Sequence, residues 1–347
     1  MTQSGRLLIS AYSVHRGGGL TLLRALLDDL PPGRCVILWL DERYPDPEPG
    51  TNGDLSIRRV RPSLLGRLRA EWQIASASTE ADRLLCFGNL PPLFTPKCKQ
   101  VSVFLQNRLL LDEYPLNEFP MFTRLRIQIE RAWLRGRYGL VSQFLVQSST
   151  MRRAVWSHLG KGVAVEIAPF LGAPSERVRA ANKPPDFDFV YVASGEPHKN
   201  HRVLIEGWKL LAEEGIRPAL ALTLDERDSP ALCAWIWAEA RTHDLRVHVT
   251  GPMDKSQIQD LYERSGALIY PSLTESFGLP LLEATGAGLP VVASELDYVR
   301  DVVVPSQTFD PRSPVSLCRA VRRQIGAPEA PRPPLSPSAL VSKILSV

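Results

Sequence analysis

The sequence predicts an α/β protein made of two doubly wound domains, each with a parallel sheet covered by helices. The chain has 347 residues, which is long for one domain and comfortable for two. Short apolar runs alternate with longer segments whose apolar residues recur at helical spacing. This alternation stops at residues 172–186, which hold Gly, Pro, Ser and Asn, and then starts again.

The first round of alternation, residues 1–171, forms the predicted N-terminal domain. Its apolar runs predict strands at 7–11, 36–40, 84–87, 101–105, 144–146 and 163–167. Its periodic segments predict helices at 20–30, 64–76, 122–137 and 150–159. Because the strand candidates are short and apolar throughout, we expect them to be parallel and covered on both faces.

The second round, residues 187–327, forms the predicted C-terminal domain after a linker at 172–186. Strands are expected at 187–192, 219–224, 247–249, 267–270 and 291–293. Helices are expected at 201–214, 231–242, 257–264, 279–287 and 315–325, with Asn200 as an N-cap. Residues 328–347 are a Pro-rich tail. Ligands of doubly wound folds bind beyond the carboxyl ends of the strands, so the two domains are expected to face each other across a cleft.

Composition excludes several classes of protein. The net charge of +4 is too small for a dedicated nucleic-acid binder. The five cysteines are scattered and form no C-x-x-C pair, which indicates a reduced cytoplasmic protein without a zinc site. We find no signal peptide and no apolar run long enough to span a bilayer.

The segment YPSLTESFGLPLLE, residues 270–283, carries the strongest chemical signal. A strand is expected to end near Tyr270, and Pro280 suits the first turn of the helix that follows. The free N–H groups of a helix start form an anion site. Glu275 and Glu283 are then placed to accept hydrogen bonds from sugar hydroxyls beside a bound diphosphate. The alternative is that Glu283 only stabilises the helix start and Glu275 is a solvated loop residue, but the surrounding sequence favours the binding role.

This segment, followed by G-x-G-L-P-V-V-A-S, closely resembles the retaining glycosyltransferase family 4, also called glycosyltransferase group 1. The resemblance implies the GT-B fold and transfer of a sugar from a nucleotide donor with retained configuration, without a metal or other cofactor. It implies that Glu283 binds the ribose and that Glu275, a catalytic candidate, contacts the donor sugar. It also places Ser276, Phe277, Gly278 and Leu279 against the sugar and phosphates.

The loop of residues 194–200, SGEPHKN, is the second candidate. Lys199 stands where the family places a phosphate-binding lysine, and it is the second catalytic candidate. Ser194 stands where the family often has an arginine, so one positive charge is missing or comes from elsewhere. His198 is expected to be an exposed loop residue, with phosphate binding as the alternative.

Two loops of the first half complete the predicted site. Gly18 and Gly19 belong to a glycine run between the first strand and the first helix, where backbone N–H groups can approach a phosphate or sugar closely. Gln106 and Asn107 stand where many family members carry a histidine. They either hold substrate hydroxyls or are plain loop residues.

Asp186 and Asp188 form an Asp-x-Asp pair, which binds a metal in another glycosyltransferase fold. There the pair follows a strand, whereas here it precedes one, so we interpret it as a loop feature without a metal.

The sequence therefore predicts a glycosyltransferase that acts on a glycan or polyprenyl-linked acceptor in bacterial surface polysaccharide or glycolipid assembly. The alternatives are a degenerate subunit that binds a sugar nucleotide without turnover, and a nucleotide-sugar epimerase on the same fold. Residues 63–72 carry arginines and are expected to form a helix. This helix either is amphipathic and binds the anionic inner face of the membrane, or has a solvated charged surface. No nucleic acid partner is expected.

Overall fold

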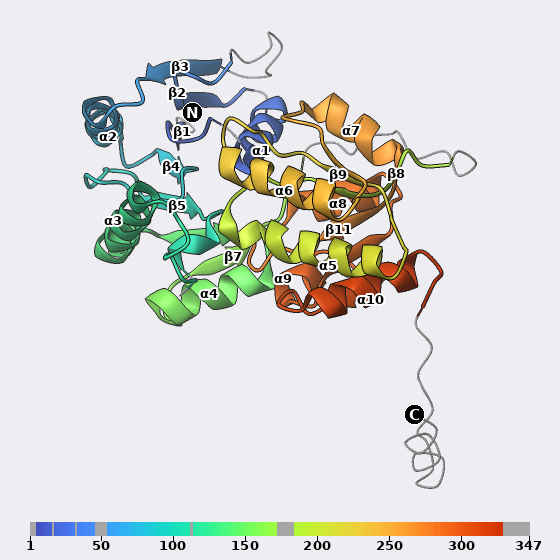
Figure 1. Cartoon of the computed structure of the whole chain (residues 1–347). Helices are drawn as coiled ribbons and strands as arrows, with labels where there is room; N and C mark the ends of the chain where they lie inside the picture. Colours follow the sequence, from blue (N-terminus) through green and yellow to red (C-terminus); the bar gives the residue numbers. More distant parts are fainter. Residues whose placement is uncertain are drawn as a thin grey trace, which may run out of the picture.

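The computed structural model describes residues 5–15, 17–31, 33–45, 54–111, 114–171 and 184–328, and these form two parallel sheets with helices packed along them (Figure 1). All paired strands are parallel. Most of the predicted linker (172–183) and of the predicted tail (329–347) lies outside the described residues.

The first sheet has seven strands in the order β3-β2-β1-β4-β5-β6-β7. They are β1 (Leu7–Ala11), β2 (Cys35–Asp41), β3 (Asp54–Val60), β4 (Arg83–Cys86), β5 (Gln100–Phe104), β6 (Gln143–Val146) and β7 (Val165–Ile167). The helices of this domain are α1 (Gly17–Asp28), α2 (Leu64–Ala77), α3 (Met121–Arg137) and α4 (Ser149–Leu159), with short 3₁₀ turns η1 (Arg108–Leu110) and η2 (Tyr138–Leu140).

The second sheet has six strands in the order β10-β9-β8-β11-β12-β13. They are β8 (Phe187–Tyr191), β9 (Leu220–Leu222), β10 (Val247–Val249), β11 (Ser265–Tyr270), β12 (Val291–Ser294) and β13 (Gln307–Phe309). The helices are α5 (His201–Glu213), α6 (Pro230–Thr242), α7 (Lys255–Glu263), α8 (Leu279–Gly286), α9 (Asp297–Arg300) and α10 (Pro314–Gln324), with a 3₁₀ turn η3 (Pro197–Lys199) before α5.

Both sheets reverse their strand order beside the first strand of the domain. In the first sheet β1 lies between β2 and β4, and in the second β8 lies between β9 and β11. Such a point opens a crevice at the carboxyl ends of the two strands, because the connections leave it in opposite directions. The predicted doubly wound fold is confirmed, with one such reversal of strand order in each sheet.

The sequence prediction was wrong in several details. β3 was missed because most of its side chains are exposed and two of them are arginines, Arg58 and Arg59, as an edge strand tolerates. α1 begins at Gly17, so the glycine run forms the first turn of the helix and not a separate loop. Asn200 precedes α5 but makes no side-chain cap, and its amide instead donates to the carbonyls of Pro271 and Pro311.

The two domains share a hydrophobic contact. Phe277 and Leu279 of the second domain pack in one buried cluster with first-domain residues that include Val14 and Phe104. A Cβ added to Gly18 would lie 3.1 Å from Leu279 Cδ1, so the start of α1 approaches the start of α8. The carboxyl ends of the two sheets therefore meet, as the sequence predicted for a cleft.

Candidate active site

The two strongest sequence motifs meet where the strand order of the second sheet reverses. The loop of residues 194–200 follows β8, and the loop of residues 271–278 follows the neighbouring strand β11. The backbone N–H of Leu273 donates to the carbonyl of His198 over 2.8 Å. The Tyr191 hydroxyl bridges the loops, donating to the Lys199 carbonyl at 2.7 Å and lying 3.0 Å from Ser272 Oγ. The loops are thus fixed to each other before any ligand binds.

Lys199 and Glu275 form an ion pair inside this junction. Lys199 Nζ lies 2.7 Å from Glu275 Oε1, and the side chains are 16% and 11% exposed. Tyr270 Oη also donates to Glu275 Oε1, at 3.0 Å. Burial raises the pKa of Glu275, but the charges of Lys199 and His198 and the hydrogen bonds outweigh burial and leave the pKa below its ordinary value. Glu275 is therefore an ionised acceptor at neutral pH.

Glu283 has a different environment on α8. Tyr262 Oη donates to Glu283 Oε2 at 3.2 Å. Burial raises the pKa of Glu283, and the hydrogen bond from Tyr262 and the charge of Lys255 only partly oppose this. The environments thus push the pKa values of the two glutamates apart, a pattern associated with distinct roles in one site.

Gly278 lets the chain turn from the Glu275 loop into α8. Its φ is +78°, and a Cβ there would lie 2.9 Å from Leu281 Cδ1. A side chain there would be strained by the left-handed backbone and would require Leu281 to shift. Pro280 follows in the first turn of α8, whose N-terminal N–H groups lie beside the Glu275 loop.

His198 is not the exposed loop residue that the sequence suggested. Its ring stacks on Phe119 with centroids 6.2 Å apart and meets Tyr114 edge-on at 6.2 Å. Burial, with the charge of Lys199, lowers the pKa of His198 to about 4, so the ring is neutral at pH 7. Through these contacts, His198 connects the loop of residues 194–200, which we call the lysine loop, to the first domain.

The first domain adds the predicted residues Gly19, Gln106 and Asn107. A Cβ on Gly19 would lie 3.5 Å from Gln106 Oε1, so α1 and the end of β5 are neighbours. Gln106 Nε2 donates to the Phe87 carbonyl at 3.1 Å. Asn107 Oδ1 accepts from the Leu109 N–H at 3.1 Å and so caps η1. Asn107 therefore positions the start of η1. The oxygen Oε1 of Gln106 lies beside Gly19 in the first turn of α1.

Arg108 is a site residue that the sequence analysis missed. One of its guanidinium nitrogens, Nη1, lies 3.4 Å from the backbone carbonyl of Glu275. Its place in the sequence, directly after Gln106 and Asn107, could have suggested a role in the site. Only the fold shows that β5 ends opposite the Glu275 loop. Arg108 brings a cation from the first domain to the same place as Lys199.

The similarity to a known family lies in the second half of the chain. Residues 174–332 match the sequence model of the family described as "Glycosyl transferases group 1". The second half of the chain is therefore similar to that family. The group 1 glycosyltransferase match contains both motif loops, Lys199, Glu275 and Glu283.

Relatives and solved structures are also similar to this chain. O-antigen chain mannosyltransferase B of Escherichia coli is 33% identical over 115 residues, and the chain spans only 30% of the length of that protein. The structure of Alr3699/HepE from Anabaena in complex with UDP and glucose has a TM-score of 0.63 at 15% identity, covering 92% of this chain and 90% of that one. The apo lipopolysaccharide outer core galactosyltransferase WaaB has a TM-score of 0.60 at 15% identity, covering 93% and 90%. At 15% identity, the similarity to the two solved structures concerns the fold alone. It confirms the expected GT-B fold.

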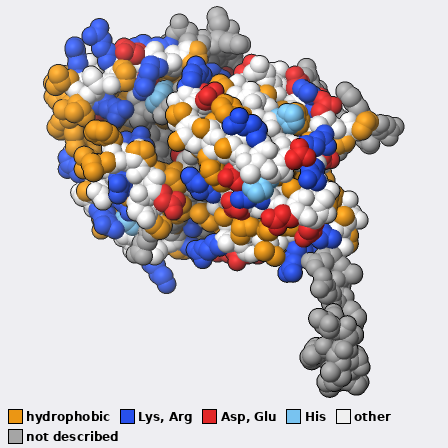
Figure 2. Space-filling model, viewed as in Figure 1, with side chains coloured by type: hydrophobic (Ala, Val, Ile, Leu, Met, Phe, Trp, Pro, Cys, Tyr) orange, Lys and Arg blue, Asp and Glu red, His pale blue; other side chains and the backbone are white. Residues whose placement is uncertain are grey.

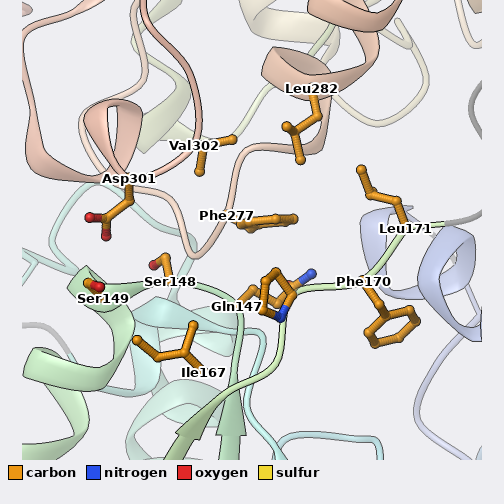
Figure 3. Close-up of a pocket in the computed structure, with 11 residues that line it drawn as sticks. Gln147, Ser148, Ser149, Ile167, Phe170, Leu171, Phe277, Leu282, Asp301 and Val302 are labelled. Atoms are coloured by element: carbon orange, nitrogen blue, oxygen red, sulfur yellow. The ribbon is translucent and has the colours of Figure 1, made fainter.

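A cavity of about 420 Å³ lies between the two domains of this GT-B fold, beside the glycosyltransferase motif (Figure 3). Phe277 and Leu282 face it from the second domain, and Ser148 and Phe170 face it from the first. Neither Lys199, Glu275 nor Glu283 lines it. It is therefore an interdomain space next to the charged junction and not the junction itself.

Three remaining predicted residues have local partners. Ser194 is exposed and donates to Glu196, so no cation stands there. Asp186 Oδ2 pairs with Arg264 at 2.6 Å, and Asp188 Oδ2 accepts from the Ala219 N–H at 2.7 Å. Within the described ranges no cluster of three or more His, Cys, Asp or Glu side chains is placed to hold a metal.

Proposed function

We propose that the chain transfers a sugar from a nucleoside diphosphate sugar to a glycan acceptor, with retention of the anomeric configuration. The observation that carries the proposal is the junction of β8 and β11, where a lysine, an ionised glutamate and a helix start converge. The family match of the second half and the fold of the whole described chain support the same activity.

The junction provides the groups that such a transfer requires. As the bond from the anomeric carbon to the diphosphate oxygen breaks, negative charge builds up on the diphosphate. Lys199 and the N–H groups of α8 stabilise that charge, and Arg108 contributes from the first domain. The diphosphate oxygen that is released accepts the proton of the attacking acceptor hydroxyl on the same face, which accounts for retention. No metal is needed in this scheme because the protein supplies the positive charge.

The two glutamates orient the donor. Glu275 is ionised and accepts hydrogen bonds from hydroxyls of the transferred sugar, while Lys199 remains within reach of the diphosphate. Glu283, further along α8, accepts from the ribose hydroxyls. Closing the domains excludes water and so limits hydrolysis of the donor.

The relatives suggest the acceptor and the pathway. The Escherichia coli relative is named an O-antigen chain mannosyltransferase, and one structural neighbour is a lipopolysaccharide outer core galactosyltransferase. We therefore place the reaction in the assembly of a bacterial surface polysaccharide or glycolipid. A polyprenyl-linked glycan is the acceptor class that fits such a pathway.

A donor screen tests the proposal directly. The purified chain is titrated with nucleoside diphosphate sugars, including glucose, galactose and mannose donors, and slow donor hydrolysis is followed without acceptor. We expect one donor to bind and to be hydrolysed, and Glu283→Ala to weaken its binding at least tenfold. Binding without hydrolysis or transfer would support the degenerate subunit, and a folded protein that binds no donor would contradict the proposal.

A further inference from the structure

Two helices of the first domain carry the same surface pattern. α2 begins Leu-Leu-Gly-Arg-Leu-Arg and α3 begins Met-Phe-Thr-Arg-Leu-Arg. In both helices the exposed apolar side chains stand at the first residue and 1, 4 and 8 residues beyond it. They are Leu64 (81% exposed), Leu65 (80%), Leu68 (45%) and Trp72 (61%) on α2, and Met121 (73%), Phe122 (88%), Leu125 (54%) and Ile129 (56%) on α3. We call these eight side chains the apolar face.

The two stripes of the apolar face lie on the same side of the molecule (Figure 1 and Figure 2). Glu71 of α2 accepts a hydrogen bond from the Leu93 N–H at 2.6 Å, and Arg137 of α3 donates to the Leu93 carbonyl. Burial raises the pKa of Glu130 on α3, and the charges of Arg126 on the same helix and of Arg67 on α2 partly oppose that rise. Figure 2 shows hydrophobic side chains gathered with Lys and Arg on the side of the molecule where Figure 1 places α2 and α3.

Each helix is built to keep this face outward. The opposite side of α2 buries Ala70, Glu71 and Ile74, and α3 buries Ile127 and Leu134. Both helices therefore pack on the domain through other residues. An exposed apolar cluster of this size on a helical surface marks an interaction site, because isolated exposed apolar residues would not align on two helices.

The charges on the two helices are mainly positive. α2 and α3 together hold seven arginines and two glutamates. Glu71 is buried, at 4% exposed, and Glu130, whose side chain is 24% exposed, lies 3.9 Å from Arg126 in an ion pair. Arg69 and Arg126 are exposed between the apolar residues. A surface that is apolar at its centre and positive around it complements a lipid surface with anionic headgroups.

We propose that the apolar face of α2 and α3 docks on an anionic bilayer, with its apolar side chains in the headgroup region and its arginines on lipid phosphates. A second copy of the chain fits this surface less well. A two-fold contact would place arginines against arginines with no exposed acid on either helix to offset them. Among the described residues no helix is long and apolar enough to cross a bilayer, so the docking is on the surface.

The docked face lies next to the candidate active site. Phe119, which stacks on the ring of His198, is two residues before Met121 at the start of α3. The chain spans at most about 7 Å over two residues, so the bilayer-facing end of α3 lies close to the lysine loop. If the proposed transferase activity holds, a lipid-linked acceptor is presented to the site from this side. The docking itself does not depend on that activity.

Vesicle binding by the full chain, without donor or acceptor, tests the proposal. The probes are phosphatidylglycerol–phosphatidylcholine vesicles and vesicles of phosphatidylcholine alone, in a co-sedimentation assay. We expect binding to the anionic vesicles only, with weaker binding at high salt because exposed charges are screened. Trp72 is 61% exposed on the apolar face and gives a second readout. Its emission should be quenched by brominated lipid, and this quenching should be lost in Trp72→Phe.

Matched variants separate the apolar and the charged contribution. Leu65→Ser with Phe122→Ser should lower anionic vesicle binding at least tenfold, and Arg69→Glu with Arg126→Glu should do the same. Val304→Ser, at a side chain that is 92% exposed and lies outside the apolar face, should bind like the unaltered chain. Because all these side chains are exposed, the variants should fold, which circular dichroism checks. Unaltered binding in both double variants would overturn the proposal, as would absence of anionic vesicle binding. A dimer that both double variants dissociate would assign the face to a second copy instead.

Discussion

Lys199 and Glu275 are 76 residues apart in the sequence, and their side chains meet at 2.7 Å. The contact exists because β8 and β11 are neighbours at the point where the strand order of the second sheet reverses. The pair joins the predicted diphosphate-binding loop to the predicted sugar-binding loop. A donor that binds to both residues must therefore replace part of the Lys199–Glu275 ion pair, which holds the two loops together.

The ion pair should contribute to stability as well as to activity. Lys199→Met leaves the Glu275 carboxylate buried without its cation, which should lower the free energy of unfolding by about 3 kcal/mol. Adding Glu275→Gln removes the stranded charge, so the double variant should recover most of that loss. Both variants should lose sugar transfer. Urea denaturation measures the stabilities, and additive effects of the two substitutions would show that the residues are not coupled.

Lys209 provides the control for this substitution. It is also a paired lysine, with Nζ 2.9 Å from Glu239 Oε2 and a side chain that is 20% exposed. It lies on α5, within a helix and not in the motif loop. Lys209→Met should therefore leave donor binding and transfer unchanged.

The turn at Gly278 should not tolerate a side chain. Gly278→Ala places a Cβ 2.9 Å from Leu281 Cδ1 at a φ of +78°, so the loop or the start of α8 must shift. We expect a loss of stability of about 1–3 kcal/mol and a donor affinity lowered at least tenfold. Gly286→Ala on the same helix is the control, since a Cβ there meets nothing within 4 Å and alanine favours the helix. Calorimetric titration would contradict this account if both variants bound donor like the unaltered chain.

The sequence predicted the fold well where strands are apolar and helices periodic. The Glu275 segment was predicted because an apolar run ends at a loop with Gly278 and Pro280. β13 was missed because its sequence, Gln-Thr-Phe, holds a single apolar residue, and β3 because most of its side chains are exposed and two of them are arginines. The environment of His198 could not be predicted, since its burial depends on Tyr114 and Phe119 of the other domain. Arg108 was missed for the same reason.

Stability should fall as the solution becomes acidic, because His201 is buried as a neutral ring. Burial, together with the charges of Lys199 and His198, lowers the pKa of His201 to about 3. In the unfolded chain the pKa is about 6.5, so below that pH the unfolded state binds a proton that the folded state does not. His201 should therefore cost about 2 kcal/mol of stability between pH 7 and pH 5.

Denaturation of His201→Gln at both pH values checks this assignment. Its loss of stability between pH 7 and pH 5 should be smaller than that of the unaltered chain, because glutamine does not titrate. His198 should keep part of the dependence, since its pKa of about 4 is also depressed. An equal loss in both proteins would mean that His201 is not the titrating group.

Asp301 should help to hold the domains closed. Its Oδ2 accepts a hydrogen bond from the Thr150 N–H at 2.5 Å, at the N-terminus of α4 in the other domain. A carboxylate at a helix N-terminus stabilises by about 1 kcal/mol, so Asp301→Asn should shift the domains about fivefold toward an open state. Small-angle scattering should then show a larger radius of gyration, and the KM for donor should rise. Asp297→Asn is the control, because Asp297 pairs with Arg153 across the same interface but both side chains are mainly exposed, at 79% and 56%. Such an exposed pair contributes little, so equal effects of the two variants would show that the helix terminus is not what holds the domains together.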